Sequence, residues 1–338
     1  MELRPFGKTG FNVFPLGFGT MNLPRVPLEQ SRAALNYALD HGINYIDTAP
    51  TYRNSEEIVG ECISHRRDEF FLATKVRNRE YKAAKEEIEN SLRRLKTDHI
   101  DLLQIHYVNY EKEYEELMGE NGSYRAALEA KEEGKVRFIG ISGHRPELLA
   151  RWLESGKFEQ VLFHLSLVQP FALEDLIPTA TRLGIAKTAM KPLSGGFVRP
   201  VDKAIRFPLS QQIDVLISGM TSVEEVKMNL AALESEISEE EGAELLRLAE
   251  ELGAHNCRRC NYCSCPIEIK IPDVMISSVV TPKLGLLPRG EQFFKDNREK
   301  LLACADYDPC KEEPQCEKLC PYHLPMQRVI QETAAGLR

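Results

Sequence analysis

Apolar and polar positions alternate along the first 250 residues in a repeating order of strand and helix. Short apolar runs recur, and between them lie segments with apolar residues three or four positions apart, such as Ile88, Leu92 and Leu95. Short continuous apolar runs are typical of buried parallel strands, whereas the wider spacing is typical of helices with one buried face. We expect strands at residues 14–19, 45–49, 70–76, 101–108, 136–142, 160–165, 186–190 and 214–219.

The helices between these strands are expected at residues 28–41, 56–66, 82–96, 124–134, 146–155, 173–183 and 221–233, with one more at 239–253. Eight strand–helix alternations predict an α/β fold, a closed (β/α)8 TIM barrel spanning residues 1–250. Residues 1–13 are expected to form a small hairpin across its floor. The Glu-rich stretch 109–122 and the Gly- and Pro-rich stretch 191–212 are expected to be loops.

Four polar side chains follow three of the expected strands. Asp47 lies near the carboxyl end of the second strand, Tyr52 in the loop after it, Lys75 near the carboxyl end of the third strand and His106 near that of the fourth. Because the carboxyl ends of parallel barrel strands meet at one rim, these side chains should lie close together. Each alone has an ordinary explanation, as a structural ion pair, a packed loop residue or a core histidine. Their joint occurrence favours an active site.

The motif Asp-Thr-Ala-x-x-Tyr, from Asp47 to Tyr52, resembles a signature of the aldo-keto reductase superfamily, as do the strand-ending Lys75 and the Leu-x-x-x-His that ends at His106. The resemblance extends over about residues 3–233. It implies an oxidoreductase that interconverts a small-molecule carbonyl and an alcohol, with NADH or NADPH as cofactor.

The residue types account for this chemistry. A phenol with a pKa of about 10 is a weak acid at neutral pH. The ammonium of Lys75, itself held by the carboxylate of Asp47, is expected to lower the pKa of Tyr52, so that Tyr52 becomes a general acid. His106 is expected to orient the carbonyl group.

The resemblance also implies cofactor contacts, some of them in the stretch Lys191–Gly196, which resembles a loop that folds over the cofactor pyrophosphate. Glycines there allow the backbone to approach phosphate closely. The implied contact residues are Thr20, Met21, Ser142, Met190, Leu193, Gly195, Gly219, Met220 and Asn229.

Several of these positions depart from the family pattern. Gly143 stands where an Asn usually follows Ser142, Leu162 where a Gln is usual, and Met190 where an aromatic ring usually stacks on the nicotinamide. Glu225 stands where a basic residue usually binds the 2′-phosphate of NADPH. Because a carboxylate repels phosphate, selectivity for NADPH is not expected.

The composition limits the classes of binding partner that we expect. The formal net charge is -8, and no basic stripe is present that would bind a nucleic acid. No run approaches the roughly 18 apolar residues that a membrane-spanning helix requires. We expect a cytoplasmic protein that binds neither nucleic acid nor membrane.

Cysteine usage separates the last part of the chain from the rest. Of the nine cysteines only Cys62 lies in the first 256 residues, and the other eight lie between Cys257 and Cys320. In a cytosolic chain such crowding predicts metal or cluster ligation rather than disulfides.

The two cysteine runs resemble the paired ligand runs of bacterial-type ferredoxins, in which each [4Fe-4S] cluster takes three thiolates from one run and a fourth from the other. Residues 251–338 are therefore expected to be a small, mainly α, ferredoxin-like domain. The resemblance implies one cluster on Cys257, Cys260, Cys263 and Cys320. A second would use Cys265, Cys310 and Cys316, completed by Cys304 or Glu313. Eight tail cysteines favour two clusters with Cys304 as the ligand.

Three functions remain open. The first is a carbonyl reductase or alcohol dehydrogenase in which the cluster is structural. The second is an enzyme whose clusters carry electrons between a ferredoxin or flavoprotein partner and a substrate at the barrel, without nicotinamide. The third is an oxygen-sensing module that binds a ligand without turnover. The four candidate catalytic residues favour an enzyme, with carbonyl and alcohol interconversion as its reaction.

Overall fold

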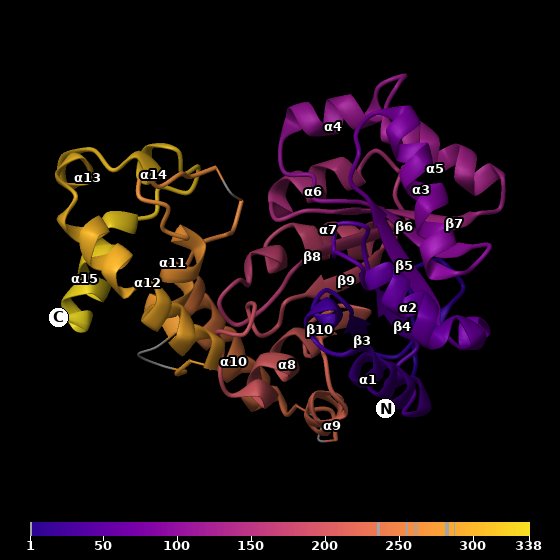
Figure 1. Cartoon of the computed structure of the whole chain (residues 1–338), viewed down its shortest axis with the longest axis horizontal. Coiled ribbons are helices and arrows are strands. Elements are labelled where there is room, and N and C mark those ends of the chain that lie inside the picture. The colour runs from indigo at the N-terminus through magenta and orange to yellow at the C-terminus, as the bar shows by residue number, and fades with distance from the viewer. Residues whose placement is uncertain (1, 235–236, 255, 261, 281–283, 287) are drawn as a thin grey trace. The chain divides into compact units, whose positions relative to one another are not determined.

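The structure is a computed structural model, and it describes residues 2–234, 237–254, 256–260, 262–280, 284–286 and 288–338 (Figure 1). The chain forms two compact units. The first comprises Met1–His164, Phe171–Pro192 and Pro208–Glu236, and the second comprises Leu165–Pro170, Leu193–Phe207 and Ile237–Arg338. The division into domains at residue 250 stays a prediction.

Eight parallel strands close into a barrel in the first unit, which confirms the expected (β/α)8 architecture (Figure 1). Neighbouring strands pair in chain order from β3 to β10, and β10 closes the barrel against β3, with Gly219 opposite Gly19. The strands are β3 (Leu16–Gly19), β4 (Tyr45–Asp47), β5 (Phe71–Val76), β6 (Ile100–Ile105), β7 (Val136–Ser142), β8 (Gln160–His164), β9 (Ala186–Met190) and β10 (Val215–Gly219).

A hairpin of β1 (Arg4–Pro5) and β2 (Asn12–Val13) forms at the amino terminus, as expected. Between its strands Phe6 is fully buried, with its ring centroid 5.4 Å from that of Tyr45 and 5.2 Å from that of Phe71. This aromatic layer fills the end of the barrel where the strands begin. The polar candidate residues lie at the other end, where the strands finish.

Helices follow the strands of the first unit. Helix α3 shows how its sequence specifies it: Glu80 caps the amino terminus by accepting a hydrogen bond from Ala83 N at 2.9 Å, and Ile88 and Leu92 lie on the buried face. The helices of this unit are α1 (Leu28–Asp40), α2 (Ser55–Ile63), α3 (Tyr81–Leu95), α4 (Glu111–Met118), α5 (Ser123–Glu132), α6 (Pro146–Leu153), α7 (Leu176–Leu183) and α9 (Val223–Ala231), with 3-10 turns at Leu23–Arg25, Ser64–Glu69 and Phe171–Leu173.

The expectation of a loop at 109–122 is wrong, because α4 lies within it. Leu117 is fully buried, and the ring of Tyr114 stacks on Trp152 with centroids 4.7 Å apart. Acidic residues in a first helical turn interact favourably with the helix dipole, so the glutamates that suggested a solvated loop also suit a short helix.

The second unit is built from helices, in agreement with a mainly α tail. A buried cluster joins them, including Ile271, Val274, Met275, Leu301 and Ile330. The helices are α8 (Val201–Leu209), of which the last two residues fall in the first unit, α10 (Glu239–Gly253), α11 (Ile271–Val280), α12 (Pro288–Asp306), α13 (Asp308–Glu312), α14 (Gln315–Lys318) and α15 (Met326–Leu337).

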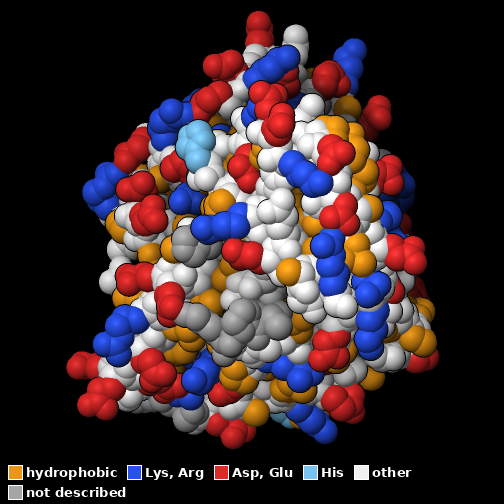
Figure 2. Space-filling model, turned by 90° about the vertical axis from the view of Figure 1, so that its left-hand side faces the viewer, with side chains coloured by type: hydrophobic (Ala, Val, Ile, Leu, Met, Phe, Trp, Pro, Cys, Tyr) orange, Lys and Arg blue, Asp and Glu red, His pale blue; other side chains and the backbone are white. Residues whose placement is uncertain are grey.

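Helix α8 corrects the expectation that residues 191–212 lack a helix. Ala204, Ile205 and Phe207 are fully buried, so the segment has an apolar face. The prolines and glycines around this short segment suggested a loop. In the described residues, no helix combines the length and the apolar character that crossing a membrane requires. Figure 2 shows acidic and basic side chains interspersed over the face in view.

Candidate functional site

A buried ion pair lies at the carboxyl ends of β4 and β5. Lys75 Nζ donates to Asp47 Oδ1 at 2.6 Å and to the carbonyl oxygen of Thr48 at 2.8 Å. The side chains of Lys75 and Asp47 are only 1% and 6% exposed. The ammonium is therefore fixed by two acceptors and shielded from water.

Tyr52 and His106 complete the set of four. The Tyr52 ring centroid lies 5.1 Å from Lys75 Nζ and 6.0 Å from the His106 ring, with the two rings nearly perpendicular. Thr51 Oγ1 lies 3.5 Å from His106 Nδ1, the outer limit for a hydrogen bond. The structure thus brings together all four side chains that the sequence singled out.

The protonation states follow from burial and nearby charge. Burial raises the pKa of Tyr52 above its ordinary value of 10.0, and the charge of Lys75 opposes this only in part. The expected net lowering of the Tyr52 pKa is therefore wrong for the protein alone, and Tyr52 is a phenol at neutral pH. Burial is the largest influence on Lys75 and disfavours its charged form, but Asp47 and Tyr52 together outweigh burial and raise the pKa of the ammonium.

His106 is neutral at the same pH. Burial, then the charges of Lys75 and Arg77, hold its pKa well below 6.5. A neutral imidazole donates a single N–H hydrogen bond. The site therefore holds two neutral donors, the phenol and the imidazole, beside one buried cation.

Gln104 was missed by the sequence analysis. Its Nε2 donates to Asp47 Oδ2 at 2.9 Å, so each carboxylate oxygen of Asp47 has its own donor. The signal was present in the sequence as one amide in the apolar strand β6, at a position whose side chain faces the barrel interior. The sequence alone gives no reason to pair it with Asp47.

Most of the implied cofactor residues of the first unit lie near the ends of β3, β7, β9 and β10, and Asn229 lies on α9. Thr20 Oγ1 donates to the carbonyl oxygen of Asp47 at 2.9 Å and lies 2.6 Å from Ser55 Oγ. Ser142 Oγ accepts from Tyr107 N at 3.0 Å. Both hydroxyls therefore already have partners within the protein.

The other implied cofactor residues differ in exposure. Met21 is 41% exposed, whereas Met220 and Asn229 are buried. Met190 ends β9 opposite His164, and Gly219 ends β10. Leu193 and Gly195 belong to the second unit, and the φ of +83° at Gly195 is one that glycine adopts readily.

Leu162, where a Gln was expected from the family pattern, packs in the barrel core. Gln160 stands two residues earlier on the same face of β8, fully buried beside Gly140. Neither amide atom of its side chain has a hydrogen-bond partner in the described residues. A Cβ at position 140 would approach Gln160 Oε1 to 2.2 Å, so Gly140 makes room for this amide.

The amino terminus of α9 is occupied by an acidic side chain, Glu225, at the position where the family pattern has a basic residue for the 2′-phosphate. Glu225 Oε2 accepts from Thr221 N at 2.6 Å and from Thr221 Oγ1 at 2.9 Å. Ser222 Oγ in turn accepts from Glu225 N at 3.2 Å. Ser222 thus caps the helix and Glu225 binds the amide just before the cap, so the backbone donors of Thr221 and Glu225 are already satisfied.

The tail cysteines, all in the second unit, form no disulfides with one another or with Cys62. Cys265, Cys304, Cys310 and Cys316 line one cavity, together with apolar residues of α11 and α15. The pKa of the Cys304 thiol is raised to about 12, mainly by burial and next by the neighbouring Cys265. Buried thiols of this kind need a compensating positive charge before they ionise.

The remaining four tail cysteines are Cys257, Cys260, Cys263 and Cys320. Burial, then Cys260, raises the pKa of the Cys263 thiol, and Cys320 contributes to the same shift. Among the described residues, no three His, Cys, Asp or Glu side chains are arranged to hold a metal ion. Glu313 lies on the surface and pairs with Lys318 at 2.6 Å.

A closed parallel barrel with its polar side chains gathered at the strand ends defines a (β/α)8-barrel enzyme. Residues 15–203 match the aldo/keto reductase family. The uncharacterized oxidoreductase YqkF of Bacillus subtilis is 30% identical over 258 residues, which cover 70% of this chain and 82% of that protein. L-galactose dehydrogenase of Arabidopsis thaliana is 27% identical, covering 69% of this chain and 88% of that protein.

Solved structures agree. The holo form of aldo-keto reductase AKR11C1 from Bacillus halodurans superimposes with a TM-score of 0.66 at 27% identity, covering 73% of this chain and 96% of that one. An aldo-keto reductase from Klebsiella pneumoniae, solved in complex with NADPH, gives a TM-score of 0.63 at 27% identity over 73% and 95% of the two chains. The chain belongs to the aldo/keto reductase family and is an oxidoreductase.

Proposed function

We propose that the chain catalyses the interconversion of a carbonyl and an alcohol with NAD(P)H, and that Tyr52 is its general acid. One observation carries the proposal: a buried ammonium, Lys75, is fixed by Asp47 and Thr48 beside the phenol of Tyr52. A cation held next to a phenol stabilises the tyrosinate that forms when the proton leaves.

In the reduction direction, a bound nicotinamide supplies the hydride. The Tyr52 Oη–H bond breaks, and its proton goes to the carbonyl oxygen, which becomes the alcohol hydroxyl. The neutral imidazole of His106 donates a hydrogen bond to the same oxygen and orients it. Lys75 stays charged throughout and offsets the negative charge left on Tyr52, while Asp47 keeps Lys75 in place.

The residues of the first unit fit a nicotinamide cofactor in part. The Klebsiella pneumoniae relative binds NADPH, which supports a nicotinamide here. Gln160 begins β8, at the end of the barrel away from Tyr52, so its buried amide does not contribute to this site. Glu225 at the start of α9 favours NADH, because its carboxylate repels a 2′-phosphate.

Titration of the purified protein with NADH and NADPH tests the cofactor. We expect energy transfer from the protein to bound NADH at micromolar concentrations, weaker binding of NADPH, and oxidation of NADH on addition of an aldehyde. Absence of binding at millimolar concentrations of both cofactors would remove nicotinamide from the proposal.

The tail, residues 251–338, is proposed to be a ferredoxin-like domain that holds two [4Fe-4S] clusters. Support comes from the cavity lined by Cys265, Cys304, Cys310 and Cys316, since iron supplies the positive charge that thiolates require. The first cluster would use Cys257, Cys260, Cys263 and Cys320. When bound, such a cluster carries one electron at a time.

A second candidate function is electron transfer without nicotinamide, in which the clusters exchange electrons with a ferredoxin or flavoprotein partner. The apolar Leu162 and Met190, at positions where the family usually contacts the ring, favour it. Turnover of a substrate with a reduced ferredoxin, in the absence of NADH and NADPH, would support this function. Turnover that requires NADH would exclude it.

A further inference from the structure

Basic side chains surround His106 on the side of the barrel formed by β5, β6 and β7. Arg77 and Arg79 follow β5 immediately, and His144 follows β7. Apart from burial, the charges that most strongly lower the pKa of His106 are those of Lys75, Arg77, Arg79 and His144. All four are basic side chains, and the two arginines share one carboxylate, Glu113, so the arginines carry an excess of positive charge.

Arg79 is already engaged by the backbone. Its Nη2 donates to the carbonyl oxygen of His106 at 2.9 Å and to that of Tyr107 at 3.0 Å. Tyr107 has a φ of +57°, the left-handed conformation that side chains rarely adopt. Arg79 therefore stabilises the turn that places His106 and Tyr107, and only 14% of its side chain is exposed.

Arg77 is the guanidinium that remains accessible. Its side chain is 40% exposed, and its Cζ lies 5.5 Å from the centre of the Tyr107 ring. The ring of Tyr107 packs edge-on against His144, with centroids 4.7 Å apart. Arg77 thus lies over an aromatic surface that continues from the residue next to His106 toward β7.

The nearby carboxylates do not pair tightly with Arg77. Glu113 Oε1 lies 3.6 Å from both Arg77 Nη1 and Arg79 Nη2, while its other oxygen accepts from Asn109 N at 2.9 Å. Glu87 accepts from the backbone of Arg77 and from Asn78, not from the guanidinium. One shared carboxylate at this distance leaves the guanidinium of Arg77 able to bind another anion.

We propose that the substrate carries an anionic group, a carboxylate or a phosphate, which Arg77 binds while the carbonyl faces Tyr52 and His106. This inference rests on the proposed carbonyl reduction and names its substrate class. The proposed phosphate contacts of the cofactor lie elsewhere, since α9 follows β10, across the barrel from β5 and β6. Arg77 therefore recognises the substrate and not the cofactor.

The test compares matched aldehydes with the full-length enzyme. Succinic semialdehyde and butanal form the carboxylate pair, and glyceraldehyde 3-phosphate and glyceraldehyde form the phosphate pair. We expect kcat/KM to favour the anionic member of at least one pair by roughly tenfold or more, the size of a charge-assisted hydrogen bond. Whichever pair shows the preference identifies the anion. Arg77→Met should remove most of that preference, and Arg77→Lys should restore part of it.

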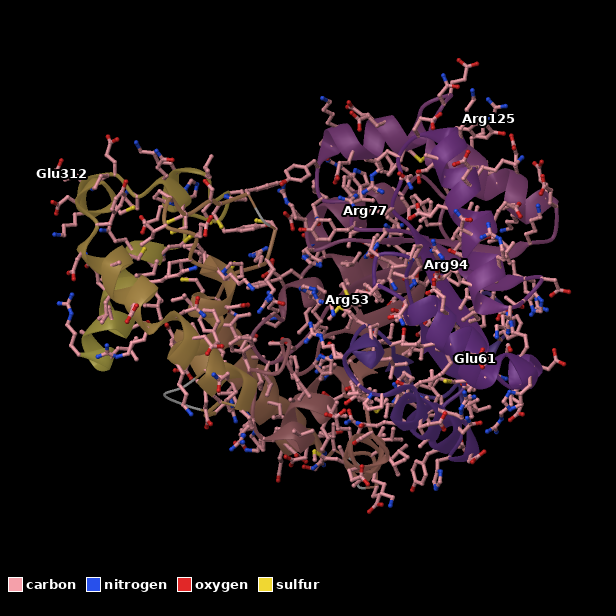
Figure 3. The ribbon with its side chains drawn as sticks, viewed as in Figure 1. Arg53, Glu61, Arg77, Arg94, Arg125 and Glu312 are labelled. Carbon is pink, nitrogen blue, oxygen red and sulfur yellow. The ribbon has the colours of Figure 1, made fainter. Side chains whose placement is uncertain are left out.

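Arg125→Met is the matched control. Arg125, on α5, also lies over a tyrosine ring, 4.8 Å from Tyr81, and faces a glutamate at 3.3 Å, but it lies on the outer helical layer (Figure 3). This variant should keep the wild-type preference. Equal discrimination by wild type and Arg77→Met, with both proteins unfolding at the same temperature, would overturn the proposal.

Binding without turnover separates this inference from the proposed function. Succinate and phosphate should each be titrated by calorimetry against wild type, Tyr52→Phe and Arg77→Met. Binding of either anion to the first two proteins but not the third supports the anion site, even if no aldehyde is reduced. Reduction of aldehydes without binding of either anion and without discrimination supports the reductase and refutes the anion site.

Discussion

At the scale of single residues, the proposed chemistry depends on how each oxygen of Asp47 is used. Lys75 donates to one oxygen and Gln104 to the other, so the carboxylate has no freedom to turn away from the ammonium. The sequence predicted the four residues at the strand ends because those positions follow recognisable strands. It did not predict Gln104, because the side chain that an interior amide meets depends on the register between strands.

The pH dependence of carbonyl reduction follows from the two shifted groups. Burial raises the pKa of Tyr52 above 10.0, so the proton that it donates is present at every pH below that value and is lost as the pH rises through it. Burial lowers the pKa of His106 well below 6.5, so the imidazole stays neutral above that value. We expect kcat to be level between about pH 6.5 and 10. A decline centred near pH 7 would contradict this assignment.

Replacing Gln104 by Leu should leave Asp47 Oδ2 buried without its donor. We expect the free energy of unfolding to fall by about 1–3 kcal/mol in urea titrations without cofactor. Gln160→Leu, on β8, is the matched control, because that amide has no partner in the described part of the chain and its loss should cost less. If both substitutions lowered the free energy of unfolding equally, the hydrogen bond to Asp47 would not be the cause of the loss.

At the scale of elements, the sequence predicted regular strands better than short helices. The bounds of β7 and β9 were predicted as observed, because continuous apolar runs identify buried parallel strands. Helices α4 and α8 were missed, since glutamates in one and flanking prolines and glycines in the other are equally typical of loops. Whether such a segment becomes helical depends on a surface to pack against, which the local sequence does not contain.

The start of α9 carries a prediction about the cofactor. Glu225→Arg removes the acidic cap and places a cation where a 2′-phosphate would lie, so the ratio of NADPH to NADH affinity should rise roughly tenfold or more. Fluorescence titration with both cofactors measures it. Glu224→Arg adds the same charge to the same helical turn without removing the bonds to Thr221 and should change the ratio less. If Glu225→Arg left the ratio of NADPH to NADH affinity unchanged, the adenosine end of the cofactor would not bind at the start of α9.

At the scale of the whole molecule, the chain combines a barrel unit with a helical unit that holds eight of the nine cysteines. The sequence shows that these cysteines lie in the tail. For the second proposed cluster it left two possible fourth ligands, Cys304 and Glu313. In the structure Cys304, on α12, lines the same cavity as Cys265, whereas Glu313 pairs with Lys318 at the surface, so the arrangement favours Cys304 as the proposed ligand. Sequence spacing alone does not show which side chains of separate helices share a cavity.

Iron and sulfide analysis after anaerobic purification tests the tail. Two clusters require about eight iron atoms per chain. Cys304→Ser should lower this value to about four if Cys304 completes the second cluster, whereas Glu313→Gln should leave it unchanged. About four iron atoms in the unaltered protein would mean that the second cysteine run holds no cluster.

The turnover of Tyr52→Phe is the most direct test of the central claim, that a phenol beside a buried ammonium donates the proton. Loss of a general acid typically lowers the rate by about 10²–10⁴-fold. We expect kcat for aldehyde reduction to fall by that factor while NADH affinity and the visible absorption of the proposed clusters stay unchanged. Tyr37→Phe, on the outer helix α1, should retain wild-type turnover. Turnover by Tyr52→Phe equal to that of Tyr37→Phe would contradict the account.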